Sequence, residues 1–283
     1  MNTDPLASLT ASRRRMGTLL MLCIAGLLGM ACRGSSAEQL PEASDVTRRM
    51  IERSQAVAGA VPGPQYMYEK RSLLERLDAT GRPMNSEERV YQVTLAGGLP
   101  SNRLVKIQGR ELSGEELRRE DARAERFRRR FVSADAKKLA AQKEGLVTPE
   151  LLDRYQFAVE QRVVLSNRPT LVLTFKPKEG DLPSSSVQDK LLNSMAGKVW
   201  IDEADADTAR LEVRLVAPAP LGWFGLLGSL NRCELSLERQ RMPDGVWINT
   251  KQILLIQFRK LATTLRFRTK EECSSFQKLE AKR

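Results

Sequence analysis

Residues 197–215 read GKVWIDEADADTARLEVRL, and this stretch decides the fold because it alternates like two β-strands on either side of an acidic turn. In its second half, Leu211, Val213 and Leu215 fall on one face, and charged side chains fall on the other. Alternation with a period of two is typical of a strand with one buried face and one face in water. The stretch therefore predicts an antiparallel pair of strands that buries one side.

The same alternation recurs along most of the chain. Turn signals separate the runs, among them DATGRP at 78–83 and Pro-Asp-Gly at 243–245. Short strands joined in succession by tight turns predict an antiparallel meander, and a sheet this wide curls over its apolar face. Strands are expected near 66–77, 90–95, 103–107, 155–160, 162–166, 170–176, 197–202, 210–216, 233–238, 246–259 and 265–268.

Two helical patterns, at 45–58 and 114–143, are the segments expected to cover the apolar face. Ser113 and Glu116 have the spacing of a capping box at the start of the second helix, which is highly charged. Its arginine run is interpreted as a solvated face, with phosphate contact as the alternative. The predicted fold is α+β: a strongly curved antiparallel sheet, an incomplete β-barrel, covered by helices.

The first 37 residues have the three parts of a bacterial signal peptide: a basic region, an uncharged apolar run at 16–30 and a region of small residues. The apolar run is shorter than the roughly 20 residues of a permanent membrane helix. Cleavage is expected either before Glu38 or behind Ala31, the second with a lipid on Cys32. An uncleaved anchor is the alternative. The expected location is the periplasm or the outer membrane, with the protein soluble or lipid-anchored.

The length of the chain limits its domain organisation, and its net charge limits the kind of binding partner. A signal peptide at 1–37, a tether with a helix at 38–64 and one curved-sheet domain at 65–283 are expected. The formal net charge of the 283 residues is +11, which in the cytoplasm would indicate nucleic acid as a partner. For an exported protein, anionic lipid head groups are better placed. We therefore expect a membrane surface as a partner, and no nucleic acid.

The sequence contains no histidine. This excludes the commonest general base, the histidine-dependent catalytic triads and most zinc sites. Four acidic residues gather in the turn of the opening stretch and could hold calcium or act as a glycosidase pair. Their spacing is not that of an EF-hand, so they are interpreted as a polar hairpin turn; they are Asp202, Glu203, Asp205 and Asp207. No enzymatic activity, metal or cofactor is expected.

Two further features remain open. Cys233 and Cys273 adjoin predicted strands and could form a disulfide in an oxidising compartment, or stay as two buried thiols. The uncharged segment 217–230 is either a membrane or cargo loop, or a plug that folds under the sheet. The large apolar residues of this loop are Leu221, Trp223, Phe224, Leu226 and Leu227.

Several short segments occur together in the order seen in one known group of envelope proteins. They are GRELSGEEL at 109–117, GKVWID at 197–202, the acids at 205–207, Arg210-Leu211 and DGVWI at 244–248. Over residues 65–276 the chain therefore resembles the outer-membrane lipoprotein-sorting-like proteins, which are related in fold to the periplasmic carriers and receptors of the Lol pathway. The resemblance implies a curved antiparallel sheet closed by helices around an apolar cavity for acyl chains. This chain is longer than the typical carrier, and none of its residues matches a known cargo contact.

Two functions are compatible with these features. The first is a non-enzymatic envelope protein that binds acyl chains of lipids or lipoproteins, with lipoprotein trafficking to the outer membrane as one role. The second is a lipid-anchored scaffold with a filled core and no ligand. A cavity of a few hundred Å³ would favour the first. Inward-facing candidates for lipid binding, with ordinary core packing as the alternative, are Val93, Leu171, Leu173, Trp200, Leu211, Val213, Leu215, Leu235, Ile253, Leu255, Leu265 and Phe267.

Overall fold

The computed structural model describes residues 39–58, 66–96, 99–131, 148–221, 228–261 and 263–280. All of its helices and strands lie in the compact unit Pro41–Arg283. The predicted signal peptide and Cys32 lie outside the described residues. No helix in the described ranges is long and apolar enough to cross a membrane.

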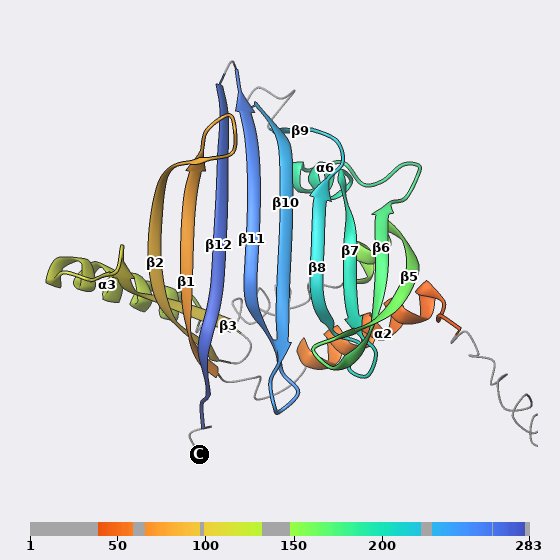
Figure 1. Ribbon diagram of the computed structural model, residues 1–283, viewed down its shortest axis with the longest axis horizontal. Coiled ribbons are helices and arrows are strands. Elements are labelled where there is room, and N and C mark those ends of the chain that lie inside the picture. The colour runs from red at the N-terminus through yellow and green to blue at the C-terminus, as the bar shows by residue number, and fades with distance from the viewer. Residues whose placement is uncertain are drawn as a thin grey trace, which may run out of the picture. The chain divides into compact units, whose positions relative to one another are not determined.

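Among the described residues, twelve strands form one antiparallel sheet in the order β4-β3-β2-β1-β12-β11-β10-β8-β7-β6-β5, with β9 paired to β10 (Figure 1). The strands are β1 (Tyr66–Leu77), β2 (Pro83–Ala96), β3 (Leu99–Ile107), β4 (Arg110–Glu111), β5 (Tyr155–Leu165), β6 (Arg168–Pro177), β7 (Met195–Asp202), β8 (Thr208–Leu215), β9 (Ala219–Leu221), β10 (Gly228–Arg241), β11 (Trp247–Lys260) and β12 (Thr263–Lys278). The pairing of β1 with β12 joins the first strands to the last. The sheet stays open, because β4 and β5 are its two edges.

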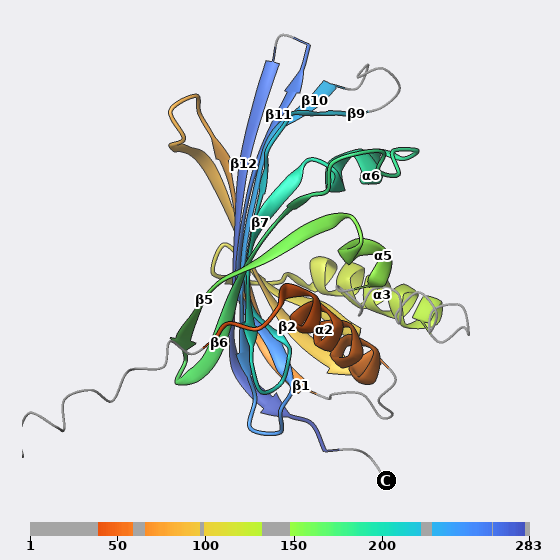
Figure 2. The ribbon, with the colours of Figure 1, turned by 90° about the vertical axis from the view of Figure 1, so that its right-hand side faces the viewer.

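Four helices of the described chain lie on one side of the sheet, which we call the helix-covered face (Figure 2). They are α2 (Ala43–Ala58), α3 (Gly114–Phe131), α5 (Pro149–Leu152) and α6 (Val187–Leu192). The other side, the opposite face, carries no helix in the described ranges. The predicted class, a strongly curved antiparallel sheet covered by helices, is confirmed. The sequence did not predict α6.

Local capping explains where three of the helices begin. The backbone N–H of Ser113 donates to Glu116 Oε2 at 2.7 Å, which confirms the capping box of α3. Thr148 caps α5 and is followed by proline at the first helical position. Ser186 and Asp189 form a second capping box at the start of α6. Each cap satisfies backbone N–H groups that have no partner within the helix.

The main core lies between α2 and the helix-covered face. Val46 and Met50 of α2 are 3% and 4% exposed, and they pack on the apolar side chains of β6 and β7. The strand register places Leu173, Val199 and Leu211 side by side across β6, β7 and β8. Burying a side chain of this size contributes about 1.5–3 kcal/mol. The alternation predicted for 210–216 is therefore the pattern that builds the core.

An apolar pocket with an arginine-rich end

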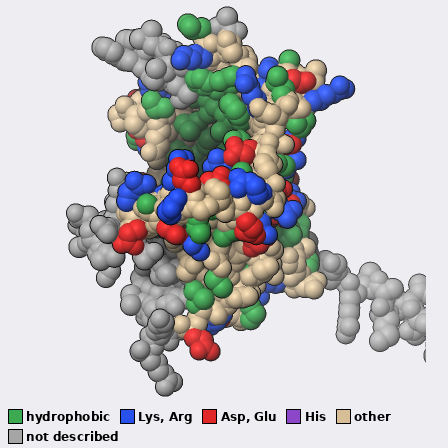
Figure 3. All heavy atoms as spheres, turned by 90° about the vertical axis from the view of Figure 1, so that its left-hand side faces the viewer, with side chains coloured by type: hydrophobic (Ala, Val, Ile, Leu, Met, Phe, Trp, Pro, Cys, Tyr) green, Lys and Arg blue, Asp and Glu red, His purple; other side chains and the backbone are tan. Residues whose placement is uncertain are grey.

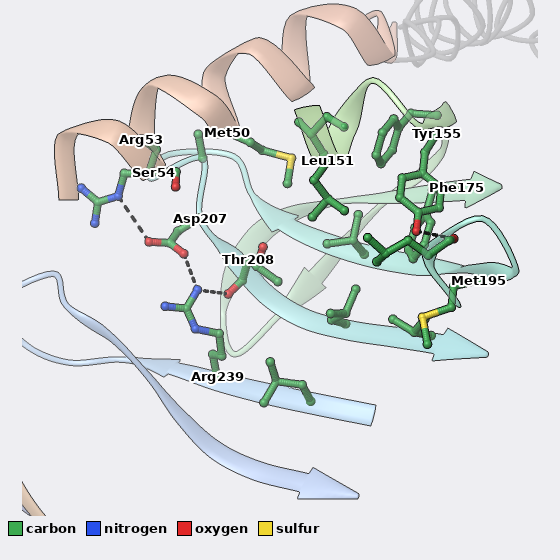
Figure 4. Close-up of a pocket in the computed structure, with 18 of the residues that line it drawn as sticks. Met50, Arg53, Ser54, Leu151, Tyr155, Phe175, Met195, Asp207, Thr208 and Arg239 are labelled. Atoms are coloured by element: carbon green, nitrogen blue, oxygen red, sulfur yellow. Dashed lines mark hydrogen bonds and ion pairs between the residues drawn. The ribbon is translucent and has the colours of Figure 1, made fainter. Parts of the chain in front are cut away.

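A pocket of about 280 Å³ lies between the helix-covered face and helices α2, α5 and α6. Its floor is formed by β5 to β8 and β10, and its walls by the helices (Figure 4). Most of the lining is apolar, including Met50, Leu151, Leu192, Met195, Leu211 and Val213. Seen from the side of β2 and α3, hydrophobic side chains gather in a hollow above a band of charged ones (Figure 3).

Three aromatic rings form one wall of the pocket. The ring of Tyr155 meets that of Phe175 edge to face, with the centroids 5.3 Å apart, and Phe157 lies 6.0 Å from Phe175. The hydroxyl of Tyr155 donates to the carbonyl oxygen of Leu192 at 2.8 Å, which ties the wall to the end of α6. Burial raises the pKa of Tyr155, so its hydroxyl stays protonated and able to donate. These contacts hold the apolar end of the pocket in a defined shape.

Gly197 in β7 makes room for this aromatic wall. It pairs with Phe175 in β6 and with Val213 in β8. A Cβ atom at this position would lie 1.9 Å from the backbone oxygen of Glu212 and 2.9 Å from Cζ of Phe175. The first residue of the GKVWID segment is therefore required for packing at this end of the pocket.

The other end of the pocket is polar. Arg53 of α2 and Arg239 of β10 both contact the carboxylate of Asp207, which lies between the two guanidinium groups (Figure 4). Arg53 Nε lies 3.3 Å from Asp207 Oδ2. Arg239 also donates to the carbonyl oxygens of Thr208 and Trp247, each at 3.0 Å. Helix, turn and hairpin thus meet at this end of the pocket.

Asp207 belongs to the acidic turn, which joins β7 to β8 as the sequence predicted. Each of the four acids is held by an arginine: Asp202 by Arg168, Glu203 by Arg162, Asp205 by Arg241, and Asp207 by Arg53 and Arg239. Burial acts to raise the pKa of Asp202, but the hydrogen bonds from Arg168 and from the backbone N–H of Asp205, together with the positive charge of Arg168, outweigh it, so the pKa is lowered. Within the described ranges, no group of three or more His, Cys, Asp or Glu side chains could hold a metal ion. The interpretation as a polar hairpin turn is confirmed.

The structure places the twelve residues that were predicted to face inward in different parts of the sheet. Leu211 and Val213 line the pocket, while Leu171 and Leu173 are buried beneath α2. Val93 is fully buried beside Tyr68 of β1. Four further candidates lie on the helix-covered face away from the pocket lining; they are Leu215, Leu235, Leu265 and Phe267.

For the remaining three candidates the predicted orientation is wrong. Trp200 pairs with Arg210, whose guanidinium lies 4.9 Å from the indole centroid. Ile253 and Leu255 lie in register with polar and charged residues of β10 and β12. All three are one residue out of step with the core positions, and side chains alternate between the faces of a strand. They therefore project from the opposite face.

The predicted disulfide is not formed, because Cys233 and Cys273 are both free. Cys233 pairs with Ile256 in β11, and Ile256 pairs with Phe267 in β12. Cys273 lies farther along β12, roughly 20 Å from that row at the rise of a β-strand. A disulfide requires Cα atoms within about 7 Å. The alternative of two buried thiols is correct in that no disulfide forms, but both cysteines are half-buried.

The predicted membrane or cargo loop lies largely outside the described residues. Leu221 ends β9, where only its backbone is described, and Trp223, Phe224, Leu226 and Leu227 lie in the gap before β10.

The sequence did not predict Arg53 and Arg239 as parts of a site. Neither belongs to a motif, and only the folded chain brings them to Asp207.

The fold and the pocket define a class of protein: an open, curved antiparallel sheet whose helix-covered face encloses an apolar pocket. No family model and no curated protein matches the chain. Similar solved structures include a DUF1329 family protein from Desulfovibrio piger ATCC 29098, 11% identical over 84% of this chain and 94% of that chain, with a TM-score of 0.33.

Two other similar structures carry the family name that the sequence motifs suggested. One is a LolA superfamily protein from Nitrosomonas europaea, 10% identical over 86% of this chain and 96% of that one, with a TM-score of 0.31. The other is described as an outer membrane lipoprotein-sorting protein domain from Vibrio parahaemolyticus. It is 12% identical over 81% of this chain and 91% of that one, with a TM-score of 0.30.

Proposed function

We propose that this protein binds the acyl chains of lipids or lipoproteins in the pocket, as a non-enzymatic protein of the bacterial periplasm or outer membrane. The observation that carries the proposal is the pocket of about 280 Å³ beneath α2, α5 and α6, with its largely apolar lining. This volume is close to the lower end of the range of about 300–1,000 Å³ for small-molecule sites. It suits one acyl chain better than a whole diacyl lipid. Carrying lipoproteins towards the outer membrane would use the same pocket.

The driving force would be the transfer of methylene groups from water into the pocket. Each buried methylene contributes about 0.8 kcal/mol, so one long chain gains several kcal/mol before ordering costs are subtracted. The lining supports this role because its aromatic wall is held in place by the bond from Tyr155 to Leu192. The carboxylates of the acidic turn are paired with arginines, which makes them poor candidates for acid–base chemistry. The predicted export signal supports the location.

Native mass spectrometry of the mature protein purified from its host envelope tests the proposal. We expect a co-purifying acyl species in stoichiometric amount. A Val213→Trp variant should lose it, because the indole would fill the pocket. Ile253→Trp is the matched control, since the same ring is added on the opposite face; this variant should keep the ligand.

Three outcomes separate the two functions. Loss of the ligand from Val213→Trp alone supports binding in the pocket. Equal loss of the ligand from both variants would show that the ligand does not bind specifically in this pocket. A protein that remains free of ligand after incubation with phospholipid and lipopeptide would contradict the proposal and favour the scaffold function. Circular dichroism of each variant shows whether the sheet is still folded.

A further inference from the structure

The charges at the polar end of the pocket do not balance. Among the described residues, six arginines contact the acidic turn, which carries four carboxylates, so these ten side chains together have a net charge of +2; the arginines are Arg49, Arg53, Arg162, Arg168, Arg239 and Arg241. Of these, only Arg53 and Arg239 line the pocket, and within the described ranges the one carboxylate there is that of Asp207. The pocket therefore has an apolar end and an end that carries a net positive charge.

The two pocket arginines are not fully used by the protein. The side chain of Arg53 is 32% exposed, and that of Arg239 is 17% exposed. Nε of Arg239 is buried and has no hydrogen-bond partner among the described residues. A guanidinium group offers a fork of donors that matches a carboxylate or a phosphate. Arg53 and Arg239 carry two positive charges, and Asp207 neutralises one of them. A second anion at this end of the pocket would neutralise the other.

The distance between the polar end and the apolar end of the pocket matches the length of a ligand with a polar head group and an acyl chain. Asp207 and Thr208 lie at the start of β8, and Val213 lies near its end. At the rise of a β-strand this separation is about 17 Å. An extended acyl chain could therefore lie along β8 with its head group beside Arg53 and its tail toward Phe175, which lies at the other end of the pocket (Figure 4).

From this geometry we infer that the ligand of the pocket is a lipid with an anionic head group, a carboxylate or a phosphate, held by Arg53 and Arg239. This rests on the proposed function and narrows it. A chain attached through an uncharged amide, as in an N-acylated peptide, offers a carbonyl oxygen but no negative charge for the guanidinium groups to pair with. Anionic lipids and fatty acids are the favoured class, and acylated peptides are the disfavoured one.

Titration calorimetry with ligands of one chain length tests the inference. The probes are dodecanoate, dodecyl phosphate, dodecanol, dodecylammonium and the uncharged acyl amide N-dodecanoyl glycinamide. We expect the two anions to bind about ten- to a hundredfold more tightly than dodecanol or the amide, since a hydrogen bond to a charged group is worth more than a neutral one. Dodecylammonium should bind most weakly. Raising the salt concentration should reduce the preference.

Variants of α2 assign the preference to its residue. Arg53→Gln should abolish the preference, so that dodecanoate and dodecanol bind this variant with similar affinities. Arg53→Lys should keep most of the preference, because it keeps the charge. Arg48→Gln is the matched control on the same helix, since Arg48 is 64% exposed and pairs with Asp45 and Glu52. It should leave every affinity as it was.

The outcomes are distinguishable. Equal affinities for dodecanoate, dodecanol and the acyl amide in the unmodified protein would overturn the inference and leave the proposed function standing. Equal effects of Arg53→Gln and Arg48→Gln would also overturn it. If no probe binds at all, the proposed function itself fails. If the two anions bind more tightly than the uncharged probes, the ratio of the dodecyl phosphate affinity to the dodecanoate affinity shows which anionic head group is preferred.

Discussion

The carboxylate of Asp205 accepts a hydrogen bond from the indole Nε1 of Trp247 at 2.9 Å. It also accepts one from Nε of Arg241. Arg241 ends β10 and Trp247 begins β11, so one carboxylate of the β7–β8 turn holds both ends of the β10–β11 turn. The two turns flank the polar end of the pocket. The geometry of that end therefore depends on this contact.

Removing the charge of Asp205 is expected to destabilise the fold. We expect Asp205→Asn to lower the free energy of unfolding by about 1–3 kcal/mol at pH 7, because charge-assisted hydrogen bonds are lost in a largely buried position. Urea unfolding followed by circular dichroism measures this. Asp121→Asn is the control, since Asp121 is 55% exposed in its pair with Arg103 and should change stability by less than about 1 kcal/mol. Equal effects of the two substitutions would contradict the prediction.

The same turn predicts how stability depends on pH. Burial acts to raise the pKa of Asp205, but hydrogen bonds from Arg241 and Trp247 and the nearby positive charges outweigh it, so the pKa is lowered. A carboxyl with a lowered pKa in the folded state stabilises the fold above its unfolded pKa of about 3.9, and this contribution is lost as pH falls through the folded pKa. Asp202 acts in the same direction.

Comparison of the unmodified protein with Asp205→Asn isolates this effect. The difference in the free energy of unfolding should be constant from pH 7 to about pH 5, and should shrink as pH falls below about 4. Urea unfolding at a series of pH values measures it. A difference that stays constant down to pH 3 would show that Asp205 does not titrate with a lowered pKa.

Gly197 provides a test of the packing beneath the aromatic wall. A methyl group there would meet the backbone oxygen of Glu212 at 1.9 Å, so Gly197→Ala should cost about 3 kcal/mol or more in the free energy of unfolding. Gly114→Ala is the control, because a Cβ there meets nothing within 4 Å, and the change should stay within about 1 kcal/mol. Chemical denaturation of both variants measures the difference. Two equally mild effects would mean that the close approach of Phe175 to Gly197 is not required.

The sequence could predict the covered face where the strands alternate strictly. In β8, Leu211, Val213 and Leu215 are separated by charged residues, so only one face could be buried. In β11 the run QILLIQF is apolar on both faces, and alternation does not distinguish them. The choice of Ile253 and Leu255 as inward-facing residues is wrong for this reason. Only the pairing with Glu234 and Arg268 places Leu255 on the opposite face.

The polar end of the pocket could not be predicted from the sequence. Arg53, Asp207 and Arg239 come from a helix, a turn and a strand that only the sheet topology brings together. Helix α6 is different, because its start has a local signal. Ser186 and Asp189 have the spacing of a capping box, and the apolar residues that follow could have indicated the helix.

The free thiols predict the chemistry of the cysteines. Burial raises the pKa of Cys273 to about 11 and also raises that of Cys233. At pH 8 the Cys273 thiol is then protonated, whereas the thiolate is the reactive form. Ellman's reagent should therefore modify the folded mature protein slowly, and both thiols should react at once in denaturant. A fast reaction with the folded protein would contradict the raised pKa values. If the denatured protein does not react with Ellman's reagent, the two cysteines are not free thiols.

Glu120 of α3 gives a last prediction, on the edge of the sheet. The residue is 6% exposed, and its carboxylate accepts the backbone N–H of Leu104 in β3 at 2.9 Å and is held by Arg123. In the described chain β4 pairs only with Lys106 and Ile107 of β3, so β4 does not cover Leu104. Unpaired N–H groups along such an uncovered strand invite pairing with other chains, and Glu120 occupies one of them.

We expect Glu120→Ala to speed hydrogen exchange at the amide of Leu104 and across α3, and to promote aggregation, because this N–H loses its acceptor and the helix loses its contact with β3. Glu120→Gln should keep part of the protection, since the amide oxygen still accepts. Glu115→Ala is the control, because Glu115 is 65% exposed and pairs only with Arg119 in the described chain. Unchanged exchange at Leu104 in Glu120→Ala would show that α3 is held on the sheet by other contacts.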